Sequence, residues 1–134
     1  MTDMLKNCHL CPRACGADRT KSRGACGAGI EIEAARASLH MWEEPPISGA
    51  NGSGTVFFSH CSLGCVFCQN RKISRREAEG QNITADALAK TFLSLEKKGA
   101  HNINLVTGAH YVPQIIEALQ IARKQGLSLP VVYN

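Results

Sequence analysis

Three cysteines on one short segment are the residues best suited to chemistry. Cys61, Cys65 and Cys68 follow the spacing C-x3-C-x2-C. Three thiolates on one tight loop can hold three irons of a 4Fe–4S cluster, and the lack of a fourth thiolate leaves one iron open for another ligand. Gly64 supplies the backbone freedom to wrap around such a group. The spacing therefore predicts an iron–sulfur site with one open iron.

Three alternative roles for this segment stay open. A zinc site could combine the three cysteines with a histidine, His60 or His110, although tetrahedral zinc is usually built from two separated ligand pairs. The cysteines could also be structural residues of a core. A nucleophilic thiolate fits less well, because three thiols on one loop favour metal binding over catalysis by a single sulfur.

A second set of cysteines lies near the N-terminus with the spacing C-x2-C-x3-C-x10-C. Its members are Cys8, Cys11, Cys15 and Cys26. Four thiolates complete the coordination shell of a structural metal. The set predicts a closed site for zinc or for a second iron–sulfur cluster, and a role without metal stays open. The basic residues that would offset the charge of four thiolates are Arg13, Arg19, Lys21 and Arg23.

The elements that must position these cysteines fall into three parts. Residues 1–30 are rich in Cys, Gly and Arg and show no helical or strand period, which predicts an irregular metal-binding segment. Residues 31–54 contain Pro45-Pro46 and a Gly-rich run, and they are predicted to be a connecting segment. Residues 55–134 are regular and are predicted to form the folded domain.

Residues 55–134 alternate between strand and helix patterns. Apolar runs at 55–58, 102–106 and 129–133 predict strands, and periodic apolar residues at 84–98 and 113–126 predict helices. This order predicts βαβ units with a parallel sheet. A closed eight-stranded barrel needs about 250 residues, so the chain is expected to form part of a barrel or a small open sheet. Active sites in such folds lie at the carboxyl ends of strands, where Cys61 is expected.

Composition narrows the classes of partner. The net charge is +4 and aromatic residues make up 5% of the chain, so nucleic-acid binding is not expected. No apolar run approaches the roughly 18 residues of a membrane span, and the N-terminus lacks a signal-peptide core, which predicts a cytoplasmic protein. In that compartment clustered cysteines usually bind metals. Arg71, Lys72, Arg75 and Arg76 form one local concentration of basic residues. It is expected to be a solvated loop, and a contact with an acidic substrate or partner or with nucleic acid stays open.

The segment 61–68, with Phe67 before the last cysteine, resembles the signature of the radical S-adenosylmethionine superfamily. The run 65–70, the N-terminal cysteine motif and residues 104–111 are similar to the pyruvate formate-lyase-activating-enzyme-like subgroup. The resemblance spans almost the whole chain but covers only the first half of the usual family member.

The resemblance implies a fold, cofactors and partners. The fold would be a partial parallel (β/α) barrel. The open iron would bind S-adenosylmethionine, whose one-electron cleavage gives methionine and a 5′-deoxyadenosyl radical. Phe67 would pack near the adenine, unless it is an ordinary core aromatic, and Thr107 and Gly108 would contact the methionine part. Implied partners are a protein substrate for glycyl-radical formation and a flavodoxin- or ferredoxin-type electron donor. The alternative is a truncated or non-catalytic, metal-stabilised α/β binding module.

Overall fold

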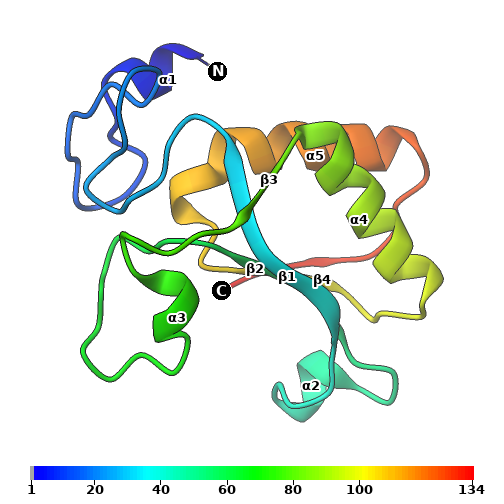
Figure 1. The fold of residues 1–134 in the computed structure, drawn as a ribbon. Coiled ribbons are helices and arrows are strands. Elements are labelled where there is room, and N and C mark those ends of the chain that lie inside the picture. Colours follow the sequence, from blue (N-terminus) through cyan, green and yellow to red (C-terminus); the bar gives the residue numbers. More distant parts are fainter. Residues whose placement is uncertain (1) are drawn as a thin grey trace.

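Five strands form one mixed sheet in the computed structural model, which describes residues 2–134 (Figure 1). The strands are β1 (Ile32–His40), β2 (Ser53–Phe58), β3 (Gln81–Ile83), β4 (Ile103–Val106) and β5 (Val131–Tyr133). Their order across the sheet is β3-β1-β2-β4-β5. Strands β2, β4 and β5 are parallel, whereas β1 is antiparallel to both β2 and β3. The protein is therefore α/β, with a partly parallel sheet.

The prediction that residues 31–54 only connect two parts is wrong. They contain β1, which at nine residues is longer than any other described strand, and the short helix α2 (Pro45–Ser48). A wholly parallel sheet is likewise not what forms. The β1 sequence, IEAARASLH, has three alanines and few β-branched residues, so its strand propensity is weak. Pairing with β2 on one side and β3 on the other stabilises it instead.

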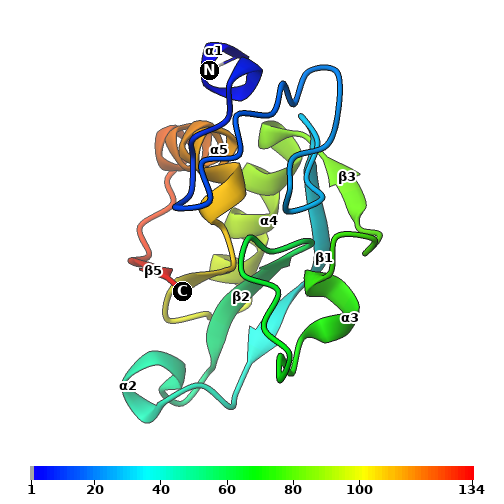
Figure 2. The ribbon, with the colours of Figure 1, turned by 90° about the vertical axis from the view of Figure 1, so that its left-hand side faces the viewer.

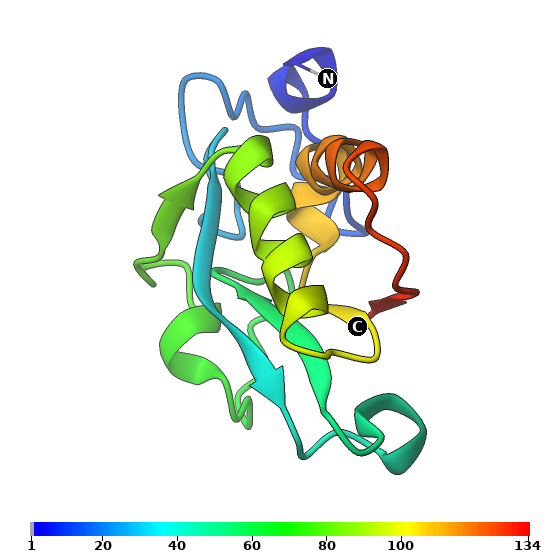
Figure 3. The ribbon, with the colours of Figure 1, turned by 90° about the vertical axis from the view of Figure 1, so that its right-hand side faces the viewer.

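Two helices cover one face of the sheet, α4 (Ala85–Lys97) and α5 (Val112–Lys124), and Figure 3 shows them side by side. The predicted start of α4 is confirmed, because Thr84 Oγ1 accepts a hydrogen bond from the Ala87 amide at 3.2 Å. A short 3-10 turn, η1 (Ala109–Tyr111), precedes α5. The buried apolar core lies between these helices and the sheet, and includes Val56, Leu88, Phe92, Ile103 and Leu105.

The topology brings the two cysteine sets to the same end of the sheet. Ala34, near the start of β1, pairs with Phe58 at the end of β2. The N-terminal segment, with its short helix α1 (Thr2–Lys6), therefore leads into β1 beside the point where the chain leaves β2 for the three-cysteine loop. That loop continues into α3 (Arg71–Ser74), on the side of the sheet away from α4 (Figure 2). Helix α2 lies at the opposite end of the sheet.

No helix within residues 2–134 has the length and apolar character needed to cross a membrane.

Candidate functional site

The three-cysteine loop joins the carboxyl end of β2 to α3. Cys61, Cys65 and Cys68 are free thiols and each is partly exposed. Gly64 adopts φ +68°, and an added Cβ would contact only Arg75 Nη1, at 3.8 Å, so it is the backbone conformation that favours a glycine there. The Leu63 amide points at the Cys61 sulfur at 3.4 Å. The Ser74 hydroxyl donates to the Cys68 sulfur at 3.5 Å. The loop thus presents accessible sulfurs, two of which already receive hydrogen bonds.

Arg75 holds the loop from its C-terminal side. Its Nη1 donates to the Gly64 carbonyl at 3.1 Å and its Nη2 to the Cys65 carbonyl at 3.4 Å. The planar guanidinium is suited to such a two-point contact. In the sequence Arg75 is only one member of a basic concentration, and its contacts with carbonyls cannot be read from that pattern.

The donor set fits an iron–sulfur cluster by its chemistry, although the thiols do not converge. Within residues 2–134, no three His, Cys, Asp or Glu side chains are arranged around a common point that could hold a metal ion. Thiolates are nevertheless the preferred ligands of such clusters, and these three are accessible and not paired in disulfides. Loading this site would require the loop to change shape.

The two histidines considered as zinc ligands are engaged elsewhere. His110 is buried, and its Nε2 lies 2.8 Å from the Ser59 carbonyl. Burial lowers the pKa of His110 to about 4, and the hydrogen bond to Ser59 only partly opposes this. His60 is fully buried, with Nε2 3.0 Å from Glu33 and Nδ1 3.3 Å from the Arg75 carbonyl. A zinc site with either histidine would disrupt these contacts.

Apolar side chains at the tip of the loop lie in solvent. Phe67 is 87% exposed, and Val66 and Leu63 are exposed as well. The alternative that Phe67 is a core aromatic is therefore wrong. Its contact with an adenine stays a prediction. An exposed apolar cluster beside ligand-type thiols is a surface that a ligand or a partner can cover.

A pocket of about 530 Å³ connects the loop with the end of β4. Its lining includes Gln69 and Asn70, which directly follow Cys68, and Thr107, which directly follows β4. Thr107 has φ +60°, an uncommon conformation for a β-branched residue and one that often marks functional sites. The structure thus places Thr107 and the residues after Cys68 around one hollow. Gly108 lies inward of it, where an added Cβ would be 2.9 Å from Ile115 Cδ1.

The same pocket extends over β1, a strand that the sequence pattern did not connect with the site. Arg36 lies over the ring of Phe57, 5.0 Å from its centroid, and the rings of His40 and Phe57 make a T-shaped pair with centroids 6.0 Å apart. Exposed Trp42 also lines the pocket. Arg36 and His40 are four residues apart on β1 and therefore lie on the same face of the strand. This period-two spacing is the signal that could have found them.

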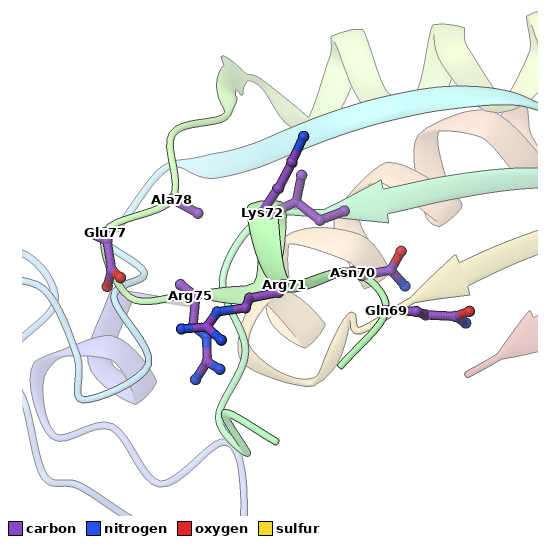
Figure 4. Close-up of a pocket in the computed structure, with 8 residues that line it drawn as sticks. Gln69, Asn70, Arg71, Lys72, Arg75, Glu77 and Ala78 are labelled. Atoms are coloured by element: carbon purple, nitrogen blue, oxygen red, sulfur yellow. The ribbon is translucent and has the colours of Figure 1, made fainter. Parts of the chain in front are cut away.

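Basic residues surround the three-cysteine loop on its other side. A hollow of about 700 Å³ lies along α3, and Figure 4 shows Arg71 and Arg75 extending together while Gln69 and Asn70 point the other way. A further pocket of about 400 Å³ is lined by Cys61 and by Cys26 from the N-terminal set, together with Arg13, Arg71, Arg75 and Arg76. One cysteine from each set therefore lines the same basic hollow.

The N-terminal cysteines differ strongly from one another. Cys8 and Cys26 are buried, Cys11 is partly exposed and Cys15 is exposed. Hydrogen bonds from the Ala25 and Ala17 backbone lower the pKa of the Cys15 thiol, whereas burial raises the pKa of Cys26. An added Cβ on Gly24 would lie 3.5 Å from the Cys26 sulfur and 3.7 Å from that of Cys15. The segment therefore folds these sulfurs around its own backbone.

The basic residues of the N-terminal segment do not all serve its thiols. Arg19 is buried, donates to the carbonyls of Gly29 and His110, and reaches Cys8 Sγ only at 3.9 Å. Lys21 pairs with Asp18. Arg23 pairs with Glu33, a buried acid on β1 that escaped prediction because it lies in the supposed connecting segment. Most of these cations therefore hold the segment together or attach it to the sheet.

Fold and site together define a class, an α/β domain with two cysteine-bearing segments at one end of a mixed sheet. An uncharacterized protein of Methanocaldococcus jannaschii is 28% identical to the chain over 137 residues. The match covers 98% of this chain and 39% of that protein, so the chain spans well under half the length of this relative. No family profile matches the chain, and no solved structure matches it.

Proposed function

We propose that the chain is the first part of a radical S-adenosylmethionine protein of the activating-enzyme type, with its cluster ligated by Cys61, Cys65 and Cys68. One observation carries the proposal. Gln69 and Asn70, which follow the last cysteine after the parallel strand β2, line one pocket with Thr107, at the end of the neighbouring parallel strand β4. Ligand sites in parallel α/β folds form at this edge. The proposal includes the fold: the mixed sheet and its helices would be part of a partial (β/α) barrel.

The chemistry that the bound cluster supplies is one-electron cleavage of S-adenosylmethionine to methionine and a 5′-deoxyadenosyl radical. The chain's own residues would bind and orient. Arg75 fixes the loop backbone through the carbonyls of Gly64 and Cys65. Thr107, Gln69 and Asn70 offer a hydroxyl and two amides toward the pocket, suited to the amine and carboxylate of an amino acid. Phe67 and Val66 offer apolar area for an adenine.

The charge around α3 supports a proposal about partners. Arg71 and Lys72 are exposed beside the loop, and they suit an acidic electron donor of the flavodoxin or ferredoxin type. A protein substrate for glycyl-radical formation belongs to the same proposal, as does a cytoplasmic location, because seven free thiols suit a reducing compartment. The proposal also includes zinc or a second iron–sulfur cluster bound by the N-terminal set, Cys8, Cys11, Cys15 and Cys26.

A second candidate is a metal-stabilised α/β binding module without catalysis. It is favoured by the exposed apolar side chains of Leu63, Val66 and Phe67, which form a surface that a partner can cover.

The deciding experiment is anaerobic reconstitution with iron and sulfide, reduction, and addition of S-adenosylmethionine. We expect the loop to bind about four irons per chain, as in one 4Fe–4S cluster. We also expect 5′-deoxyadenosine to form. Cys65→Ala should abolish that cluster and the product. A retained cluster without 5′-deoxyadenosine supports the binding module. A colourless zinc protein contradicts both the cluster and the activity.

A further inference from the structure

A hydrogen-bonded triad of Arg23, Glu33 and His60 joins the two cysteine-bearing regions. Glu33 on β1 is almost fully buried. Its Oε1 accepts a hydrogen bond from Arg23 Nη1 at 2.7 Å, and its Oε2 lies 3.0 Å from His60 Nε2. Arg23 belongs to the N-terminal segment, and His60 immediately precedes Cys61. One carboxylate therefore touches both regions from the strand between them.

The direction of each hydrogen bond follows from the groups involved. A carboxylate only accepts, so His60 Nε2 is the donor to Glu33. Arg23 Nη1 lies 3.2 Å from the same nitrogen, which then has no lone pair to offer. The Nη1 hydrogens go instead to Glu33 and to the Gly27 carbonyl, 2.6 Å away. Glu33 is thus the acceptor that allows two donors to lie so close together.

The backbones of the two regions also meet at this point. Gly27 has φ +100°, and a Cβ there would lie 2.8 Å from His60 Nδ1 and would collide with the Arg76 carbonyl. His60 itself has φ +70°, while its amide donates to the Ile73 carbonyl at 2.7 Å. A non-glycine residue keeps such a conformation only where its surroundings over-determine it. Glu33 and Arg23 are parts of those surroundings that come from outside the loop.

We propose that Glu33 is a positioning residue for the three-cysteine loop: it fixes His60, and through Arg23 it makes the loop's conformation depend on the four-cysteine segment. The inference rests on the proposed function only for the identity of the group that the loop binds. The loop's thiols then depend on two regions that are distant in the sequence and adjacent at the end of the sheet.

The test compares the whole chain with Glu33→Gln, Arg23→Gln and the double variant, with Glu96→Gln as the matched control. Glu96, near the end of α4, is a carboxylate that accepts hydrogen bonds from Ser128, between α5 and β5. Arg23 is half-exposed, so Arg23→Gln leaves the fold intact even where the buried substitution does not. Hydrogen exchange is measured by mass spectrometry for residues 59–64 and, as an internal reference, for β4.

Both single variants should raise exchange of residues 59–64 at least tenfold and leave β4 unchanged. The double variant should be no faster than the faster single variant, because both substitutions remove the same link. After reconstitution, the iron assigned to the loop, defined as the share lost in Cys65→Ala, should fall at least fivefold in each. Glu96→Gln should match the unsubstituted protein in every measurement.

Unchanged exchange of residues 59–64 in Arg23→Gln would overturn the dependence on the N-terminal segment. Strictly multiplicative effects in the double variant would show two independent contacts and would also overturn it. If the unsubstituted protein retains no iron at the loop, the proposed function fails, while the exchange data still decide the positioning role.

Discussion

The two cysteine-bearing regions differ in how much of their cysteine set they bury. The N-terminal segment buries Cys8, Cys26 and the side chain of Arg19, whereas Cys11 is partly exposed and Cys15 is exposed. The three-cysteine loop buries none of its cysteines and places Phe67 in solvent. A partly buried set suits a structural metal, and an accessible set suits a site that a substrate must reach. The difference supports a division into one structural and one reactive region.

The division does not make the regions independent, and the glycine between them gives the largest expected effect. Gly27→Ala should lower the free energy of unfolding by at least about 3 kcal/mol, because strain at φ +100° adds to a collision with the neighbouring backbone. Gly126 has the same φ with nothing within 4 Å, so Gly126→Ala should cost only about 1 kcal/mol. Urea unfolding measures both. Equal losses of unfolding free energy in Gly27→Ala and Gly126→Ala would mean that the two regions are not in close contact at Gly27.

The second largest effect is expected from acid, which should weaken the contacts of His110 with both regions. His110 bonds the Ser59 carbonyl before the loop, and its own carbonyl accepts from Arg19 of the N-terminal segment. Burial lowers its pKa to about 4 from 6.5, so below pH 6.5 the unfolded chain binds a proton that the folded chain does not. The free energy of unfolding should therefore decrease as the pH is lowered below 6.5, by about 2 kcal/mol at pH 5.

Urea unfolding of the metal-free protein at pH 7, 6 and 5 checks this slope. His110→Gln should flatten it, whereas the exposed His101→Gln should leave it unchanged. Glu33 acts at lower pH: burial raises its pKa, but hydrogen bonds from His60 and Arg23 outweigh this and lower it overall. Its contribution is thus present above its unfolded pKa of 4.5 and is lost as the pH falls through the lower, folded pKa.

The smallest effect is expected inside the loop. Arg75→Ala frees the carbonyls of Gly64 and Cys65 and should cost about 1 kcal/mol. The loss should appear mainly as faster hydrogen exchange and faster alkylation of Cys65. Arg71→Ala is the control, since no hydrogen bond from its side chain is found within residues 2–134. Equal alkylation rates in the two variants would mean that Arg75 does not hold the loop.

The sequence predicted the elements that depend on local signals and missed those that depend on contacts between distant residues. Thr84 and Gly99 delimit α4 through caps that depend on neighbouring residues, and both helices and the β2, β4 and β5 strands lie near their predicted positions. Strand β1 escaped prediction because its alanines carry little strand propensity and its partners come later in the chain. The pairing of Glu33 with His60 was missed for the same reason, as 27 residues separate them.

The sheet ends in two different edges. On one side β3 pairs only with Ile32–Ala34 of β1, and on the other β5 pairs only with β4 among the described strands. A further strand that paired with β5, from a longer chain or from another molecule, would lie next to Asn134 and the pocket that Asn134 helps to line. Such a strand would therefore become a wall of the candidate site.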